Sequence, residues 1–237
     1  DDPLRERAAV ELLVDRCCDA IILYSRYMPE ADLVQLVETL PVPLMVMNRP
    51  VPGYPERAVV FDQSGSVAAA IDYLLAQGHR RIACIAGPQQ TLTARTRLAA
   101  WQQALRSVGV EPEAEWIAEG DNLVDGGYRA CQQLLARGTA FTALFASNDD
   151  MAIGAMKQLH AHGVSVPAQV SVIGFDDIAI APYTIPALSS VKIPVTEMIQ
   201  ETIGRLIFML GDGAFTPPKT FTGELIQRDS VAPPASR

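Results

Sequence analysis

Short apolar runs alternate with longer amphipathic segments along almost the whole chain. The runs at 82–86, 143–146 and 170–175 consist mainly of Ile, Val, Ala and Phe, which is typical of strands buried on both faces of a parallel sheet. Between such runs, apolar residues recur at three- and four-residue spacing, as in the segment 94–108, and this spacing predicts helices. Strand–helix alternation of this kind predicts parallel sheets sandwiched between helices, an α/β fold.

The apolar runs and the helical spacing predict strands and helices in a regular order along the chain. Strands are expected at 19–24, 43–47, 58–61, 81–86, 116–118, 143–146, 170–175, 188–193 and 221–228. Helices are expected at 4–17, 29–40, 64–78, 94–108, 125–137, 149–162 and 196–210. The expected apolar face of the first helix is Leu4, Ala8, Leu12 and Val14. The expected apolar face of the last helix is Ile199, Ile203, Leu206, Ile207 and Leu210.

Length and charge narrow the class of protein. A chain of 237 residues, 49% of them hydrophobic, suffices for one large domain or two modest ones. With 19 Lys and Arg against 27 Asp and Glu, the formal charge is −8, and the one basic group, 79–81, fits the end of a helix better than a DNA-contacting surface. No apolar run approaches the ~18 residues of a membrane span. We therefore expect this chain by itself to bind neither nucleic acid nor a membrane.

The cysteines and the N-terminus favour a cytoplasmic protein. Cys17, Cys18, Cys84 and Cys131 form no C-x-x-C pair, and most lie in apolar periodic runs. Buried, reduced thiols are therefore expected. The first residues, DDPLRE, do not resemble a signal peptide.

Motifs for catalysis are missing from the sequence. It holds no G-x-G-x-x-G, P-loop, H-E-x-x-H or G-x-S-x-G pattern. The string from Ser189 to Lys192 matches S-x-x-K, but that chemistry needs a helix start and here the string falls in an expected strand. His160 and His162 point to different sides of their helix, so they predict no metal site. We expect no enzyme activity, no cofactor and no metal.

Polar residues instead follow the expected strands. Asp62, Asn148 and Asp176 each come directly after an apolar run, and ligands of open α/β sheets bind outside the carboxyl ends of strands. Arg97 lies near the start of its helix, close to Thr93. Carboxylates, amides and guanidinium groups suit the recognition of sugar hydroxyls. An ordinary structural ion pair between Arg97 and Asp176 explains the same residues equally well, and the nearby Trp101 fits a core position better than a stacking platform.

An ordered set of motifs resembles the LacI/GalR family of bacterial transcription repressors over essentially the whole chain. The motifs are 78–83 (GHRRIA), 87–88 (GP), 97–101 (RLAAW), 148–155 (NDDMAIGA), 172–177 (VIGFDD) and 186–188 (PAL). The segment 170–230 is most similar to a repressor of a β-glucoside operon, for arbutin, salicin and cellobiose. The resemblance implies a sugar-sensing domain of such a repressor.

The family fold implied is periplasmic-binding-protein-like: two lobes, each with a parallel sheet flanked by helices, joined by three crossovers, with the sugar between them. The first lobe is expected at 1–61 plus 193–216, and the second at 62–192 plus 217–237. The family's effector contacts fall on Arg97, Asp176 and Asn148, and further on Asn48, Asp62, Thr93 and Ser25. Asn122 stands where relatives often carry an aromatic stacking residue.

The chain also departs from the family at its N-terminus. The family's helix-turn-helix and hinge helix are expected to be absent from this chain, and so are the first strand, first helix and second strand of the first lobe. The strand at 20–24 would then form an exposed apolar edge, and such edges recruit partners. We expect another chain to pair with this edge, or the first lobe to be loosened.

The resemblance implies a cytoplasmic homodimer that binds a sugar effector, reaches operator DNA only through the missing N-terminal domain and represses a sugar utilisation operon. A periplasmic sugar-binding protein of a transport system is the alternative, because that class shares the fold and the 148–149 and 174–177 segments. A signal peptide upstream would favour the transport protein, and a helix-turn-helix would favour the repressor.

Overall fold

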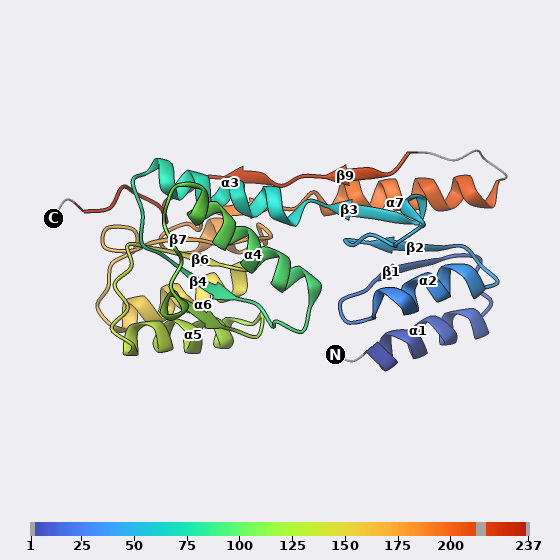
Figure 1. Cartoon of the computed structure of the whole chain (residues 1–237), viewed down its shortest axis with the longest axis horizontal. Helices are drawn as coiled ribbons and strands as arrows, with labels where there is room; N and C mark the ends of the chain where they lie inside the picture. The colour runs from blue at the N-terminus through green and yellow to red at the C-terminus, as the bar shows by residue number, and fades with distance from the viewer. Residues whose placement is uncertain (1–2, 212–216, 236–237) are drawn as a thin grey trace. The chain divides into compact units, whose positions relative to one another are not determined.

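The computed structural model describes residues 3–211 and 217–235. The chain divides into two compact units, each formed from two stretches of sequence (Figure 1). Unit 1 comprises Asp1–Asp62 and Pro194–Thr222, and unit 2 comprises Gln63–Ile193 and Gly223–Arg237. Each unit has its own parallel sheet flanked by helices, which confirms the predicted fold class.

The sheet of unit 1 has four parallel strands. Their spatial order is β1 (Ile21–Tyr24), β2 (Leu44–Met47), β3 (Ala58–Phe61) and β9 (Lys219–Phe221). The helices of this unit are α1 (Pro3–Asp15), α2 (Glu30–Thr39) and α7 (Val195–Leu210), with a 3-10 turn at Pro55–Arg57. Strand β2 is buried along its whole length, as expected for a strand covered on both faces.

Alternation along β2 assigns the helices of unit 1 to the two faces of the sheet. Leu44 and Val46 share a hydrophobic core with residues of α1 and α2. Met45 is also fully buried, and successive side chains of a strand point to opposite faces. Because α7 contacts β2 and β3, we infer that Met45 packs beneath α7.

The expected apolar faces of α1 and α7 are wrong in part. In α1, Leu4 and Leu12 are exposed and Val10 is the buried residue, because the helix packs on its neighbours through Val10 and Val14. In α7, the sheet contact is made through a different strip of the helix, and Leu206 alone of the expected face is buried. The buried residues of α7 are Met198, Thr202, Arg205 and Leu206, and the exposed apolar residues include Ile199, Ile203, Ile207 and Leu210.

Strand β1 forms one edge of the unit 1 sheet. Within the described part of the chain it pairs with β2 alone, and its Ile22 and Tyr24 side chains are exposed. The strand therefore lies at an exposed edge, as expected. The pairing of this edge with another chain stays a prediction.

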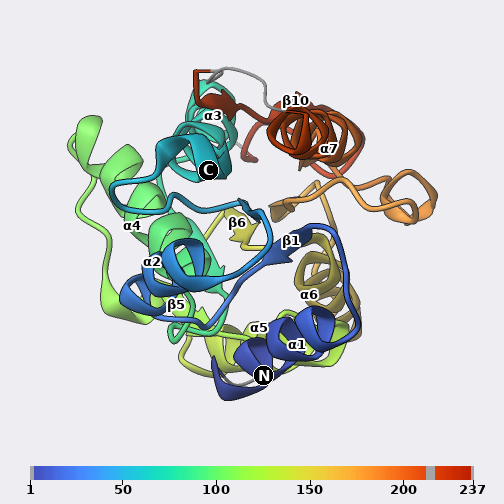
Figure 2. The same ribbon diagram turned by 90° about the vertical axis from the view of Figure 1, so that its right-hand side faces the viewer.

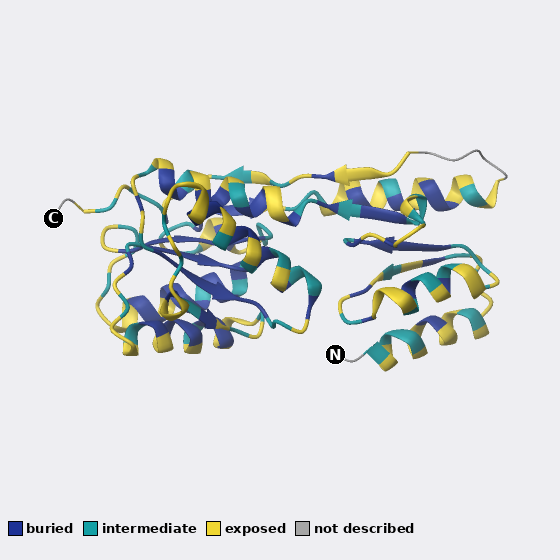
Figure 3. Cartoon of the chain, in the orientation of Figure 1, coloured by how far each residue is buried: buried dark blue, intermediate teal, exposed yellow. Residues whose placement is uncertain are grey.

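Unit 2 contains a four-stranded parallel sheet and a two-stranded antiparallel one. The parallel order is β5 (Ile117–Glu119), β4 (Ile82–Ala86), β6 (Ala143–Ala146) and β7 (Ser171–Ile173), and the antiparallel pair is β8 (Ser190–Lys192) with β10 (Glu224–Ile226). The helices are α3 (Gln63–Ala76), α4 (Leu92–Ser107), α5 (Val124–Ala136) and α6 (Asp149–Ala161), with 3-10 turns at Ala114–Trp116 and Ala181–Tyr183. Strands β4, β6 and β7 are buried throughout, as Figure 3 shows by the dark blue ribbon.

Two close helices cover one face of this sheet. α5 and α6 lie side by side in both ribbon views (Figures 1 and 2), and they share a core with Ile85 of β4 and Leu144 of β6. Their approach depends on glycine, because a Cβ added at Gly154 would lie 1.9 Å from the carbonyl oxygen of Val124. This packing places the start of α6 beside the segment that leads into α5.

The strand expected at 221–228 is wrong in part, because only its first residue, Phe221, lies in β9 and only residues 224–226 form β10. β9 ends at Phe221 and pairs with β3 in unit 1, whereas β10 begins at Glu224 and pairs with β8 in unit 2. The chain passes from one unit to the other at 222–223, so Phe221 and the later residues of the expected strand belong to different sheets.

Two sequence expectations concern single side chains. Cys84 and Cys131 are buried free thiols, as expected, but Cys17 is exposed because it lies in the turn that ends α1, at φ 56°. Trp101 is fully buried, which supports its interpretation as a core residue. Among the described helices, none is long and apolar enough to cross a membrane.

Candidate functional site

Polar residues of unit 2 gather where the parallel strands end. Ser147 and Asn148 directly follow β6, Asp176 lies just beyond β7, and Gly87 follows β4. Carboxyl ends of parallel strands meet at one edge of the sheet, which is where open α/β folds bind ligands. The contacts described below join these residues into one network.

Arg97 is at the centre of this network. It lies on α4, whose first turn is capped by Thr91: the Thr91 hydroxyl accepts a hydrogen bond of 3.2 Å from the Ala94 N–H. The guanidinium group is buried and lies 3.8 Å from the centroid of the Phe175 ring, a cation–π contact. Its planar group therefore has a fixed orientation.

Further hydrogen bonds hold the Arg97 guanidinium group. Its Nε donates to Oε1 of Gln63 at 2.8 Å, and Nη1 donates to the carbonyl oxygen of Ser147. Nη2 pairs with Oδ1 of Asp176 at 3.3 Å. The Arg97 side chain is 8% exposed, whereas that of Asp176 is 33% exposed, so the carboxylate is the more open member of the ion pair.

Asp176 has an unusual backbone conformation. Its φ is 106° and that of Asp177 is 55°, in the region that favours glycine. Residues held in such conformations cluster at ligand sites, because the surrounding structure must hold them there. Asp176 pairs with Arg97, so the two charges compensate each other, and the surrounding contacts hold Asp176 in this conformation.

Asn148 connects two helices. Its Oδ1 accepts a hydrogen bond of 2.9 Å from the Met151 N–H and caps α6, while its Nδ2 donates to the carbonyl oxygen of Asn122 at 2.9 Å. Asn122 has a φ of 67°, and its Oδ1 lies 2.8 Å from where a Cβ of Gly87 would be. The Asn122 side chain therefore lies over the end of β4, in the same strand-end network.

Thr93 is placed one helical turn before Arg97. It is half-buried in the first turn of α4. Residues four apart lie on the same face of a helix, so Thr93 lies on the Arg97 face of α4.

The remaining candidates belong to unit 1. Asn48 follows β2 with a φ of 73°, and its Nδ2 donates to the Tyr24 hydroxyl at 2.9 Å. Asp62 follows β3 and is half-buried. Ser25 follows β1, is buried, and donates through its hydroxyl to Oε2 of Glu6 at 2.8 Å. These three residues follow three adjacent strands of the unit 1 sheet.

Glu6 holds the turn that begins at Ser25. Its carboxylate accepts hydrogen bonds of 2.9 to 3.1 Å from the backbone N–H groups of three successive residues, 26–28, besides the Ser25 hydroxyl. Burial by itself would raise the pKa of Glu6, but these hydrogen bonds more than offset that effect, and the pKa lies below its ordinary value. Carboxylate and turn therefore stabilise each other above acidic pH.

Three residues that lie next to the candidate site residues were not identified from the sequence. Gln63 orients Arg97, Glu6 orients the Ser25 turn, and Asp149 supports Asp176, as argued below. For Gln63, a usable signal existed: it is a polar residue directly after a strand, next to Asp62. The contacts of Glu6 and Asp149 depend on tertiary structure and carry no comparable signal.

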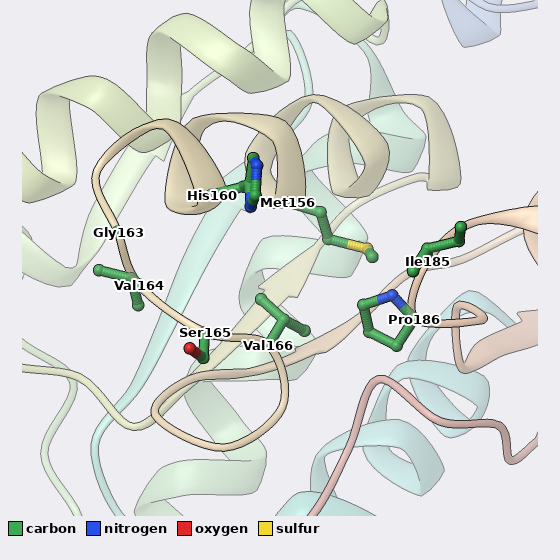
Figure 4. Close-up of a pocket in the computed structure, with 8 residues that line it drawn as sticks. All are labelled: Met156, His160, Gly163, Val164, Ser165, Val166, Ile185 and Pro186. Carbon is green, nitrogen blue, oxygen red and sulfur yellow. The ribbon is translucent and has the colours of Figure 1, made fainter.

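A separate cavity lies at the far end of α6. It has a volume of about 440 Å³, and its walls are mainly apolar, with His160 and Ser165 as polar side chains (Figure 4). None of the residues in the Arg97 network lines it. Within the described ranges, no group of three or more His, Cys, Asp or Glu side chains is arranged to hold a metal ion.

Comparisons with known proteins match this architecture. A sequence model of the periplasmic binding protein-like domain matches residues 71–231. AscG, an HTH-type transcriptional regulator of Escherichia coli K12, is 50% identical over 230 residues, which is 97% of this chain and 68% of AscG. A crystal structure of the Escherichia coli repressor ascG matches with a TM-score of 0.88 at 50% identity, and the match covers 95% of this chain and 83% of the ascG chain.

Two more distant structures share the fold over nearly the whole length. The complex of the transcriptional regulator CelR with cellobiose has a TM-score of 0.86 at 30% identity, covering 97% of this chain and 71% of that chain. The lac repressor dimer bound to operator and the anti-inducer ONPF has a TM-score of 0.86 at 27% identity, covering 95% and 78%. With the domain model matching more than half of the chain and AscG matching nearly all of it, the chain belongs to the LacI/GalR family of transcriptional regulators.

Proposed function

We propose that this chain is the domain of a LacI/GalR-type repressor that senses a sugar effector, and that the effector binds to Arg97, Asp176 and Asn148. The observation that carries the proposal is the Arg97–Asp176 pair at the strand ends of unit 2, with a buried guanidinium and a partly exposed carboxylate. Relatives support the sugar: CelR is a regulator solved in complex with cellobiose. Cellobiose is itself a β-glucoside, so the CelR complex supports a β-glucoside as the effector.

The chemistry of the network suits a neutral, hydroxyl-rich ligand. A carboxylate accepts hydrogen bonds from hydroxyl groups, and a guanidinium group donates them in a fixed plane. Because the two charges compensate each other, a neutral ligand leaves no uncompensated charge behind. At Asn122 the amide offers hydrogen bonds rather than a stacking surface, which favours recognition through hydroxyl groups.

The regulatory output follows from the family. The lac repressor is solved as a dimer bound to operator, and AscG is an HTH-type regulator. We propose that this chain acts as a homodimer in the cytoplasm and reaches operator DNA through an N-terminal helix-turn-helix domain. The sugar changes DNA affinity only if it binds the two conformational states of the regulator with different affinities.

Thermal melting against a panel of sugars tests the proposal. The panel holds glucose, galactose, fructose, ribose, cellobiose, salicin and arbutin. A ligand at about 100 times its dissociation constant adds roughly 2.7 kcal/mol of stability. That raises the melting midpoint by about 5 to 10 °C in a chain of this size. We expect such a shift with a β-glucoside.

Two arginine variants locate the site. Arg97→Ala is expected to fold, with a lower midpoint of its own, and to lose the sugar-induced shift, because the central donor is gone. Arg95→Ala removes an exposed arginine from the same helix and is expected to keep the shift. Equal sugar responses in both variants would refute the assignment of Arg97, and the absence of a shift with every sugar would refute a simple sugar as effector. For unit 1, Asn48→Ala is expected to reduce the sugar-induced shift in the same assay, and an unchanged shift would refute the predicted contact of Asn48.

A further inference from the structure

Asp149 is a fully buried carboxylate at the first residue of α6. It lies next to Asn148 in the sequence, yet its side chain points into the protein and takes no place among the proposed effector contacts. Burying a carboxylate costs free energy unless hydrogen bonds satisfy it. The partners of Asp149 therefore indicate what the residue does.

All of these partners lie on, or support, the segment 175–178. The Asp149 N–H donates to the carbonyl oxygen of Phe175 at 2.8 Å, and Oδ2 accepts from the Ile178 N–H at 2.8 Å. Asp149 thus bonds to the first and last residues of the segment. Asp176 lies between these two attachments.

A serine on β8 adds a third connection. Oδ1 of Asp149 accepts from the Ser190 hydroxyl at 2.6 Å, and the same hydroxyl oxygen accepts from the Asp177 N–H at 3.1 Å. Ser190 is itself fully buried. The carboxylate therefore orients the serine, and the serine holds the residue next to Asp176.

Space for the carboxylate depends on Gly174. A Cβ added there would lie 2.1 Å from Oδ1 of Asp149, so any larger residue would displace the carboxylate. The segment that follows is strained, since Asp176 and Asp177 both have positive φ. Strained backbone persists only where its surroundings hold it, and Asp149 supplies those bonds.

We propose that Asp149 is a positioning residue for effector binding, whose carboxylate holds the segment 175–178 so that Asp176 faces Arg97. The inference rests on the proposed function, because it assigns Asp149 a role toward the carboxylate that contacts the sugar. Asp149 itself does not contact the effector.

The electrostatics of Asp149 agree with a role other than stability. Burial raises its pKa to about 7; hydrogen bonds from Ser190 and Ile178 oppose that rise, and the nearby charges of Asp176 and Asp177 add to it. These two neighbours are themselves paired, Asp177 with Arg228 at 2.7 Å and Asp176 with Arg97. A carboxyl whose pKa is higher in the folded state stabilises the fold most at low pH, and that contribution is lost as the pH rises through 7.

Asp149→Asn tests the proposal, with Asp150→Asn as matched control. Both remove one carboxylate from the first turn of α6, but Asp150 is less buried. An asparagine offers one acceptor oxygen where the aspartate offers two, so the Ser190 hydroxyl and the Ile178 N–H can no longer both be satisfied. Amide hydrogen exchange, followed by NMR without any sugar, is expected to be at least about tenfold faster at Asp177 and Ile178 in Asp149→Asn, and unchanged in Asp150→Asn.

Two further readouts separate positioning from a merely structural role. The dissociation constants of salicin and cellobiose are expected to rise about tenfold in Asp149→Asn and to stay unchanged in Asp150→Asn. As the pH rises from about 4 to 7, the melting midpoint of Asp149→Asn is expected to rise relative to that of the unmodified chain, because only the unmodified chain loses the bound proton of Asp149. If Asp149→Asn does not fold, Ser190→Ala, which leaves the carboxylate in place, is expected to change exchange and binding in the same direction.

The outcomes distinguish this inference from the proposed function. Unchanged exchange at Asp177 and Ile178 overturns the role of Asp149, whatever the sugars do. Faster exchange with unchanged sugar affinity also overturns it, because the segment is then released without consequence for binding. If the unmodified chain binds neither salicin nor cellobiose, the β-glucoside assignment fails, and the exchange data still decide whether Asp149 holds Asp176 in place.

Discussion

Replacing Gly154 by alanine is expected to destabilise unit 2 and disturb the strand-end network together. The added Cβ would lie 1.9 Å from the carbonyl oxygen of Val124 and 2.6 Å from the backbone nitrogen of Tyr128. Carbon–oxygen contacts ordinarily occur at about 3.4 Å, so α5 and α6 must separate by roughly 1.5 Å. Both obstacles are backbone atoms, which cannot rotate away as a side chain can.

The size of the effect follows from this geometry. Overpacking that shifts the backbone costs about 1 to 3 kcal/mol, and a clash with rigid backbone belongs at the upper end. One kcal/mol changes the melting midpoint by about 2 to 4 °C in a domain of this size. Gly154→Ala is therefore expected to lower the midpoint by about 6 to 12 °C. The same shift of α5 should weaken the hydrogen bond from Asn148 to the carbonyl oxygen of Asn122, and so weaken sugar binding.

Gly204 offers a control with the opposite expected sign. It lies on α7, and no atom lies within 4 Å of where its Cβ would be. Alanine stabilises an unobstructed helix by about 0.5 to 1 kcal/mol relative to glycine, which raises the midpoint by about 1 to 4 °C. Calorimetry of both variants measures the pair. A Gly154→Ala midpoint within about 2 °C of the unmodified chain would show that α5 and α6 adjust freely, contrary to this reasoning.

Two other substitutions test single residues. Arg97→Lys keeps the positive charge, but one ammonium group cannot donate to the oxygen atoms of both Gln63 and Ser147 as the planar guanidinium does, so we expect the free energy of unfolding in urea to fall by about 2 to 3 kcal/mol. Arg95→Lys, on the exposed side of the same helix, should change it by less than about 0.5 kcal/mol. Equal losses in the two variants would contradict this reasoning. Glu6→Gln should cost about 1 kcal/mol at neutral pH. Because the pKa of Glu6 is lowered in the folded state, its contribution to stability is present above its ordinary pKa and is lost as the pH falls. The melting midpoints of Glu6→Gln and of the unmodified chain should therefore converge toward pH 3. A difference between the two midpoints that stays constant with pH would show that the charge of Glu6 does not stabilise the turn.

The buried strands could be predicted almost to the residue. The expected runs 58–61 and 143–146 coincide with β3 and β6. Strands of a parallel sheet are covered on both faces, so they are continuous apolar runs that end where the sheet ends. The strand expected at 221–228 missed the start of β9 and the break before β10, because two short, partly exposed strands in different sheets give no continuous apolar run.

Helix faces were harder to predict for a related reason. α7 carries apolar residues on more than one strip, and Met198 and Leu206 pack inward while Ile199 and Ile203 are exposed. Periodicity identifies each strip equally well, but only the neighbouring elements decide which one is buried. In the same way, the positions of Arg97 and Asp176 could be expected from the strand ends and the family resemblance, whereas the supporting contacts of Asp149 depend on three segments distant in sequence.

Several residues that follow the strands have backbone conformations that cost stability. Asn48, Asn122, Asp176 and Asp177 all follow strands, and all have positive φ. Such conformations cost about 1 kcal/mol or more each, and the φ of 106° at Asp176 lies beyond the usual left-handed region. Glycine would relieve that strain but would remove the polar side chain. A structural ion pair would gain nothing from an aspartate in a strained conformation, supported by a second, buried aspartate whose ionisation is itself unfavourable. Under the proposed function, a ligand that needs the Asp176 carboxylate at this position accounts for both costs together.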